Sequence, residues 1–308
     1  MWEPQFDAII PTLKKTDFPV EVLVETTAYC NLKCSMCPQK TLKRAKGEMS
    51  FDTFKKIVDE IARESPDTRL WLAIMGEALL LGDKLIEMIL YAKKAGVINI
   101  HLNTNAVLMK PDLCEKLIMA GVSEIIIGID SYREETYDKI RVGGDLTTVV
   151  ENIKYLLDVI KERKLSQPRL YLQYILMDEN EEEFEDFKQF WLNLGAKLKV
   201  RPKIGWGTAV DTHRSLNLPP AARTFPCPML IRNCAIHWNG NFAHCSDADF
   251  EGEYSPGNIK NMSIKEVWNG ELAKRREQHW KGDFSHDLCK NCRDWQTGRS
   301  LFFEPEAR

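Results

Sequence analysis

Between Val20 and about Ile204 the sequence alternates short apolar runs with amphipathic stretches, and this alternation restricts the fold more than any other feature. The short runs are rich in β-branched residues and almost continuously apolar, as expected of strands covered on both faces. Successive strand–helix units predict a parallel sheet with right-handed crossovers. There are fewer units than the eight of a closed barrel, so we expect an α/β fold with an open, partial (βα)6 TIM-like barrel. The expected strands are Val20–Glu25, Arg69–Ile74, Ile98–Leu102, Glu124–Ile129, Leu170–Leu176 and Leu198–Ile204.

The stretches between these strands have the 3.6-residue period of amphipathic helices. Ser50 is a suitable N-cap for a helix over Phe51–Arg63, where one face is apolar. Glycines follow several of these stretches, at positions where a helix commonly ends. The remaining expected helices are Leu85–Ala95, Asp112–Ala120, Leu146–Lys161 and Glu182–Leu194, with Gly96, Gly121 and Gly195 beyond three of them.

The composition changes after Gly205, where Gly, Pro, Asn, Asp, His and Cys dominate and Ser263–His279 is the one clear helical pattern. A segment of this composition lacks the apolar residues for a large core, so we expect a bound metal group to help it fold. The sequence therefore predicts a short N-terminal extension (1–19), the partial barrel (20–204) and a small C-terminal domain (205–308).

Composition and charge exclude several classes of protein. The chain has 42 basic and 45 acidic residues among 308, so it lacks the positive charge typical of a nucleic-acid-binding protein. No apolar run is long enough to span a membrane, and the first residues do not resemble a secretory signal. We therefore expect a cytoplasmic protein with neither a nucleic-acid nor a membrane partner. An odd number of cysteines, nine, then favours metal or redox chemistry over disulfides.

Three of the cysteines, Cys30, Cys34 and Cys37, follow the first expected strand directly. In a parallel α/β sheet, ligands bind at the carboxyl ends of the strands. Three thiolates on one loop suit an iron–sulfur cluster, in which one iron would stay open to a substrate or cofactor. The alternative is a zinc knuckle with a fourth ligand elsewhere.

The CxxxCxxC spacing after the first strand of a βα barrel resembles that of the radical S-adenosylmethionine (SAM) enzymes. The resemblance implies that Met36 packs against the adenine of SAM, and that Gly76 and Glu77 hold its amino group. Met75 and Ala78 depart from the Gly-Gly-Glu-Pro form of that segment. Further polar residues at strand ends then become candidate contacts of SAM or substrate, although such residues also act as simple caps and turn formers. They are Asn103, Asn105, Asp130, Ser131 and Gln173.

For this family the resemblance also implies the reaction. A reduced cluster cleaves SAM reductively, and the resulting 5′-deoxyadenosyl radical abstracts hydrogen from an unactivated C–H bond. The cofactor carries that reactivity, while the barrel orients the substrate and excludes water. The implied cofactors are SAM and a [4Fe–4S] cluster, reduced by a donor such as flavodoxin or ferredoxin.

A second group of cysteines lies in the C-terminal segment, where an Asn-Gly hairpin signal precedes one of them. The arrangement resembles the SPASM/twitch extension of radical SAM enzymes, in the twitch form of 2-deoxy-scyllo-inosamine dehydrogenase-like and twitch epimerase enzymes. That resemblance implies a single auxiliary [4Fe–4S] cluster, because no cysteine follows Cys292. A structural zinc ribbon is the alternative. The implied ligands are Cys227, Cys245, Cys289 and Cys292.

Two cysteines and two basic residues remain. Cys114 lies in a helical pattern and is expected in the core. Cys234 is either a buried structural residue or a hydrogen-atom donor to a substrate radical, as an epimerase requires. Arg201 and Lys203 lie on the last expected strand and are candidate catalytic residues, as a base or a substrate clamp, or are simply solvated.

The leading prediction is a radical SAM oxidoreductase acting on a hydroxyl or amino carbon of a sugar or aminocyclitol-type small molecule. The auxiliary cluster would take the second electron. The alternatives are a radical epimerase that uses Cys234, a peptide-modifying SPASM-type enzyme, and a non-catalytic protein that carries zinc or a cluster.

Overall fold

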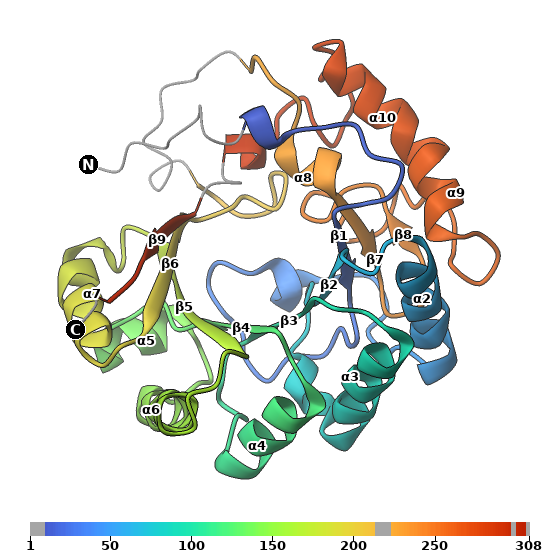
Figure 1. Cartoon of the computed structure of the whole chain (residues 1–308). Coiled ribbons are helices and arrows are strands. Elements are labelled where there is room, and N and C mark those ends of the chain that lie inside the picture. Colours follow the sequence, from blue (N-terminus) through green and yellow to red (C-terminus); the bar gives the residue numbers. More distant parts are fainter. Residues whose placement is uncertain (1–9, 213–222, 297–299, 306–308) are drawn as a thin grey trace.

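The computed structural model describes residues 10–212, 223–296 and 300–305. Its centre is a curved nine-stranded sheet in the order β8-β7-β1-β2-β3-β4-β5-β6-β9, with helices on its convex side (Figure 1). Neighbouring strands from β1 to β6 pair in parallel, which confirms the predicted partial barrel. These strands are β1 (Glu21–Val24), β2 (Arg69–Leu72), β3 (Ile100–Thr104), β4 (Glu124–Gly128), β5 (Arg169–Leu176) and β6 (Lys197–Pro202).

The expected helices form close to their predicted bounds. Ser50 caps the first of them, since its hydroxyl accepts a hydrogen bond from the N–H of Thr53. Gly96 and Gly121 end two helices in the left-handed conformation that glycine adopts without strain. The helices are α2 (Phe51–Glu64), α3 (Asp83–Ala95), α4 (Pro111–Ala120), α6 (Leu146–Glu162) and α7 (Phe184–Asn193), and a short α5 (Glu134–Ile140) was not predicted.

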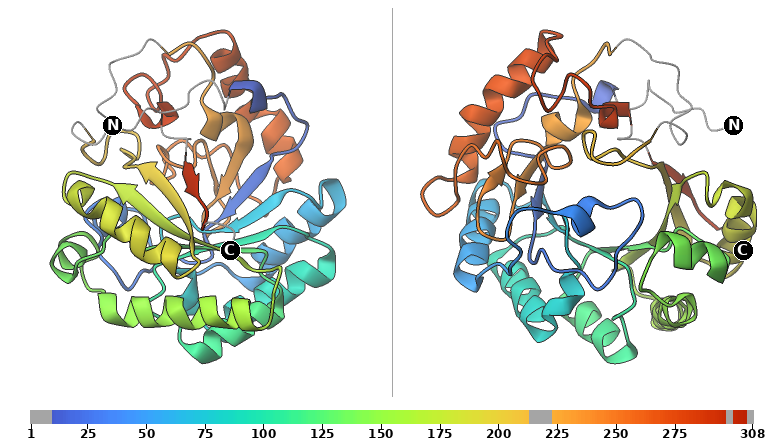
Figure 2. Two further views of the ribbon diagram at one scale, coloured as in Figure 1. Left: turned by 60° about the vertical axis from the view of Figure 1, so that its left-hand side comes forward. Right: turned by 180° about the vertical axis from the view of Figure 1, so that it is seen from behind.

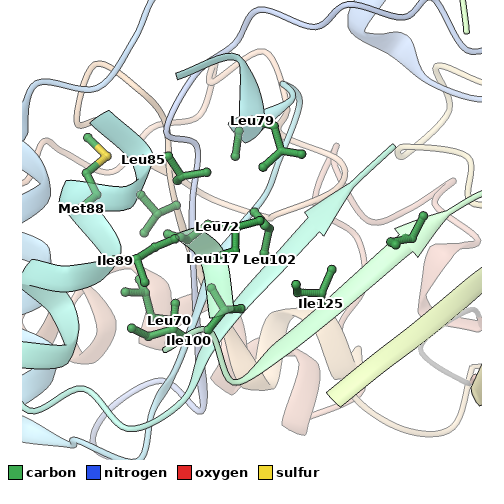
Figure 3. Close-up of a cluster of buried hydrophobic side chains, with 14 of the residues drawn as sticks. Leu70, Leu72, Leu79, Leu85, Met88, Ile89, Ile100, Leu102, Leu117 and Ile125 are labelled. Atoms are coloured by element: carbon green, nitrogen blue, oxygen red, sulfur yellow. The ribbon is translucent and has the colours of Figure 1, made fainter. Parts of the chain in front are cut away.

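The main core lies between the convex face of the sheet and these helices. Figure 3 shows leucine, isoleucine and methionine side chains of α3 and of β2 to β4 meeting there. Alternate residues of each strand supply this core, for example Leu70 and Leu72 of β2, which are fully buried. The other face of the sheet is therefore the one that lines the interior of the barrel.

The C-terminal segment is less separate than its composition predicts. Three of its strands extend the barrel sheet: β7 (Asn233–Ile236), β8 (Phe242–Ala243) and β9 (Leu301–Phe303). β7 pairs in parallel with β1, and β9 pairs antiparallel with β6, so both edges of the six-stranded sheet are covered. An uncovered edge would leave a row of backbone groups unpaired. Side chains of this segment, including Val267 and Trp268, also enter the main core.

The helix predicted over Ser263–His279 is divided in two at Gly270. The first part, α9 (Ile264–Asn269), begins with a capping box between Ser263 and Glu266, and α10 (Glu271–Trp280) follows. The remaining short helices are α8 (Pro228–Arg232) and the 3-10 turns η1 (Ile10–Thr12), η2 (Pro38–Thr41), η3 (Ala78–Leu81), η4 (Glu181–Glu183) and η5 (Asp294–Gln296). Within the described ranges, no helix is long and apolar enough to cross a membrane.

Candidate functional site

The first three cysteines lie on the loop between β1 and α2. Figure 2 (right) shows this segment, with η2, in front of the opening of the barrel. Cys30, Cys34 and Cys37 are close enough to influence one another electrostatically. Burial, reinforced by the neighbouring thiols, raises the pKa of Cys30 to about 11 and that of Cys37 to about 12. Three enclosed thiols on one short loop are a donor set suited to an iron–sulfur cluster.

An apolar shell surrounds these three cysteines. Met36 is 5% exposed and lies in this shell, which keeps water from one side of the loop. Its carbonyl oxygen accepts a hydrogen bond from the indole N–H of Trp206 at 3.2 Å, so the loop is joined to the segment that follows β6. The buried residues of the shell are Leu32, Cys34, Met36, Ile140, Ile175 and Met177.

A buried ion pair lies beside Cys34. Arg141 donates one hydrogen bond to the Cys34 sulfur at 3.6 Å and another to the carboxylate of Asp130. Although burial opposes its charge, Asp130 and the Cys34 thiolate hold the pKa of Arg141 above its usual range. Asp130 adopts a left-handed backbone conformation (φ 57°) after β4, and its other carboxylate oxygen accepts the N–H of Ile175 at 2.6 Å. Asp130 thus positions Arg141 next to the thiols.

Gly76 and Glu77 fasten the end of β2 to the cysteine loop and to β3. A side chain on Gly76 would lie 2.0 Å from the carbonyl oxygen of Thr27, so only glycine fits this close approach. The N–H of Glu77 donates to the carbonyl of Tyr29 at 2.9 Å. The Glu77 carboxylate is 3% exposed and accepts from the N–H groups of Leu79 and Asn105 and from the hydroxyl of Thr104, at 2.8 to 3.1 Å.

The other polar residues predicted at the strand ends form hydrogen bonds in different parts of the site. Asn105 donates to the side-chain oxygen of Asn31 at 2.9 Å and so ties the end of β3 to the cysteine loop. Asn103 lies in the barrel interior, where it accepts from the indole N–H of Trp71 at 3.0 Å. Ser131 is 1% exposed and donates to Glu183 at 2.8 Å, so its hydroxyl is engaged in the loop after β4.

The barrel interior is accessible to solvent. Along β2 and β6, side chains on the interior face are partly exposed, whereas those on the helix-covered face are buried. Gln173 and Arg201 meet there, with Arg201 Nε donating to the Gln173 side-chain oxygen at 3.2 Å. Lys203 follows β6 and is partly exposed. The interior face of the barrel is therefore lined by polar, partly exposed side chains, and we call the space that they face the hollow.

The C-terminal cysteines come from three separate places. Cys227 precedes α8, Cys245 follows β8, and Cys292 lies before η5. Burial raises the pKa of each, to about 11 for Cys227, and the three thiols also influence one another. Cys289 is in the same turn as Cys292, whose N–H donates to the Cys289 carbonyl at 3.2 Å. Burial raises the pKa of Cys289, while Arg223 and Arg275 favour its thiolate.

Two carboxylates connect this second group of thiols with the barrel interior. Asp247 is 7% exposed, and burial beside Asp294 raises its pKa to about 7. Arg201 interacts electrostatically with both Asp247 and Asp294, which are two residues beyond Cys245 and Cys292. The second thiol group is thus linked electrostatically, through these two carboxylates, to Arg201 in the barrel interior.

Comparison with protein families agrees with this pairing of two cysteine sites. A family model described as the radical SAM superfamily matches residues 24–190, more than half of the chain. The chain belongs to the radical SAM superfamily. A second model, described as an iron–sulfur cluster-binding (SPASM) domain, matches residues 227–293. The cofactors predicted from the sequence are thereby confirmed as SAM with its [4Fe–4S] cluster and an auxiliary iron–sulfur site, and the zinc alternatives are overturned.

Curated relatives cover only part of this radical SAM protein. One is the tungsten-containing aldehyde ferredoxin oxidoreductase cofactor-modifying protein of Pyrococcus furiosus, 26% identical over 56% of this chain and 48% of that relative. Another is the AdoMet-dependent heme synthase of Methanosarcina barkeri, 35% identical over 41% of this chain and 35% of that relative. The chain thus spans about half the length, or less, of these two relatives.

Solved structures share the fold over almost the whole chain. BtrN in complex with AdoMet and 2-DOIA has a TM-score of 0.64 at 19% identity, covering 91% of this chain and 94% of that one. SuiB of Streptococcus suis, bound to S-adenosylmethionine, has a TM-score of 0.67 at 13% identity, covering 94% and 74%. At these identities the likeness establishes the fold alone.

The position of Cys234 argues against the hydrogen-donor role considered for it from the sequence. Cys234 lies on β7 directly opposite Val22 of β1, and paired residues of neighbouring strands point to the same face. Both are fully buried in the core between sheet and helices, on the side away from the barrel interior. A thiol there cannot reach a substrate in the hollow. Cys114 is in the same core, as predicted.

Sequence reasoning missed three residues at this site. Trp206 contacts the cysteine loop, Asp247 adjoins the auxiliary cysteines, and Lys199 lies in the barrel interior. The two-residue period of a strand would have revealed Lys199, because it shares a face with Arg201 and Lys203. For Trp206 and Asp247, which lie in irregular segments, the sequence holds no comparable signal.

Proposed function

We propose that this radical SAM enzyme oxidises a hydroxyl or amino carbon of a small molecule, of the sugar or aminocyclitol type, bound in the barrel interior. The observation that supports the proposal is the electrostatic interaction of Arg201 in the barrel interior with Asp247 and Asp294, which interact in turn with Cys245 and Cys292. An electron acceptor held by those thiols would adjoin the substrate. A redox-neutral epimerisation would instead need a hydrogen donor, and Cys234 is turned away.

The oxidation of an alcohol carbon removes two electrons and two protons in total. When bound, SAM and its cluster supply the abstraction of one hydrogen atom from the substrate carbon. The hydroxyl proton then passes to a basic group or to water, and the remaining electron leaves for the acceptor held by the C-terminal cysteines. Of the catalytic candidates predicted from the sequence, Arg201 is oriented by Gln173 and suits a clamp on the substrate oxygen. Lys203, at the mouth of the same hollow, is the second candidate.

The proposal also covers the electron donor, the cellular location and the residues that would hold the cofactors. A one-electron donor such as flavodoxin or ferredoxin would reduce the clusters, and the protein would act in the cytoplasm. Of the site residues, Met36 and the backbone at Gly76 would face SAM, while Glu77, Asn105 and Asp130 would hold the segments around it in place. The metal ligands would be Cys30, Cys34, Cys37, Cys227, Cys245, Cys289 and Cys292, for one SAM-binding and one auxiliary cluster.

The test removes the proposed electron acceptor. The double variant Cys289→Ala/Cys292→Ala is reconstituted anaerobically and compared with wild type and with Cys114→Ala, a matched control for loss of a buried cysteine. A panel of sugars, aminocyclitols and short peptides is screened for compounds that increase 5′-deoxyadenosine. We expect one equivalent of oxidised product per 5′-deoxyadenosine in wild type and Cys114→Ala, and SAM cleavage without oxidised product in the double variant. Oxidised product from the double variant, or a modified peptide as the sole product, would contradict the proposal.

A further inference from the structure

Among the described residues, the interior faces of β1 and β4 carry two buried carboxylates, Glu21 and Glu124, and each already has its own partners. Glu21 accepts from Arg69 at 2.7 Å and from Arg232 at 3.1 Å. Glu124 is bound by Arg169 and by the ring of His101, both at 2.9 Å. Each of these carboxylates thus already has cationic partners and forms no ion pair with the further positive charge on this face.

Lys199 brings such a further charge. It lies on β6, and its ammonium group is 5.2 Å from the ring centroid of Trp71, which is on β2. In the sheet order, three strands (β3, β4 and β5) lie between β2 and β6, so this contact crosses the hollow inside the curved sheet. The indole N–H of Trp71 is held by Asn103 at 3.0 Å, which fixes the ring as a floor beneath the ammonium group.

Within the parts of the chain that the structure describes, Lys199 forms no ion pair. Burial and the nearby positive charge of Arg201 together lower its pKa to about 8, although Glu124 and Glu21 act in the opposite direction. Arg201 uses Nε for Gln173 and Nη1 for its neighbour's carbonyl at 3.2 Å. Arg201 has the carboxylates Asp130, Asp247 and Asp294 near it, whereas Lys199 has no ion-pair partner among the described residues, so an anion bound beside Lys199 would stabilise its buried charge.

We propose that Lys199, together with Arg201, binds an anionic group of the substrate, a carboxylate or a phosphate, above the ring of Trp71. The inference rests on the proposed function insofar as the barrel interior is the substrate site, and it narrows the substrate class to acids or phosphate esters. The anion would be anchored deep in the hollow, which leaves the rest of the molecule directed towards the cysteine loop. Lys199 is a specificity residue in this arrangement.

The first test measures binding and needs no turnover. Succinate and inorganic phosphate are titrated by calorimetry into the reconstituted, SAM-loaded enzyme. We expect one of them to bind in the millimolar range, and Lys199→Met to weaken that binding about tenfold to hundredfold, as expected for loss of a charge-assisted hydrogen bond. Lys199→Arg, which keeps the charge, should retain most of the affinity. Lys197→Met is the matched control, since Lys197 lies on the same strand but pairs with Glu304 at 3.0 Å.

The anion that binds shows whether the substrate carries a carboxylate or a phosphate ester. Binding of succinate alone indicates a carboxylate, and binding of phosphate alone indicates a phosphate ester. If neither anion binds, or if Lys199→Met binds as tightly as wild type, the proposal is overturned.

A second arm separates this inference from the proposed function. Neutral sugars and aminocyclitols are compared with the matching acids and phosphates for stimulation of 5′-deoxyadenosine formation. Preference for the charged compounds, lost in Lys199→Met, supports the inference. Equal stimulation by neutral compounds overturns it and leaves the proposed oxidation intact. Stimulation by none of them contradicts the proposed function, while the calorimetry still decides whether Lys199 binds an anion.

Discussion

Replacement of Cys234 distinguishes a structural thiol from a chemical one. The residue is fully buried in the core shared by β7, β1 and the helices. Cys234→Ala removes one heavy atom, comparable to the loss of a single buried methyl group, and should cost about 0.5–1.5 kcal/mol. Cys234→Ser is closer in size but places a hydroxyl in an apolar site, which should cost about 1–3 kcal/mol. Burial therefore predicts that serine is the more destabilising replacement.

Two measurements on the same samples test whether Cys234→Ser is less stable than Cys234→Ala. Thermal unfolding of the anaerobically reconstituted proteins, at one scan rate, should show falls in Tm of about 2–4 °C for each kcal/mol lost, larger for serine than for alanine. SAM cleavage and product formation should be unchanged below the unfolding transition, and product formed in D2O should carry no deuterium at the reacting carbon. Equal stability of both variants, combined with loss of product in both, would refute the placement of Cys234 in the core.

Three further predictions concern the barrel site. The triple variant Cys30→Ala/Cys34→Ala/Cys37→Ala should lower the iron content from about eight to about four per chain, as expected for loss of one of two four-iron clusters; retained reductive SAM cleavage would contradict this ligand set. Glu77→Ala leaves three buried donors without an acceptor and should reduce the free energy of unfolding by about 3–5 kcal/mol in denaturant titrations. Arg141→Met removes the positive charge beside Cys34 and should lower the midpoint potential of the adjacent cluster in an electron paramagnetic resonance titration, whereas Lys139→Met on the same helix should leave it unchanged.

Most of the barrel could be predicted because the sequence patterns that specify its strands and helices involve only neighbouring residues. The apolar runs and helical periods give β1 to β6 and their helices within a few residues, and the Ser50 cap and the glycines mark helix ends. The cysteine spacing identifies the radical SAM site for the same reason, since all three residues lie on one short loop. The Asn239-Gly240 turn likewise forms the hairpin between β7 and β8.

The C-terminal segment could not be predicted in the same way. Its composition indicates a small separate domain, yet β7 and β9 complete the edges of the barrel sheet and α9 packs into the main core. These contacts join residues more than 200 positions apart, such as Val22 and Cys234, and depend on a strand register that no local pattern specifies.

The sequence by itself determined the fold of the barrel, its family and the presence of two groups of cysteines, because periodicity and short spacings are properties of neighbouring residues. The tertiary structure alone decided which side chains face the substrate. A strand alternates its side chains between two faces, and only the curvature of the sheet and the packing of helices on one side make one face the core and the other the hollow. That difference places Cys234 in the core and Lys199 beside Arg201 in the interior, and our two proposals are built on it.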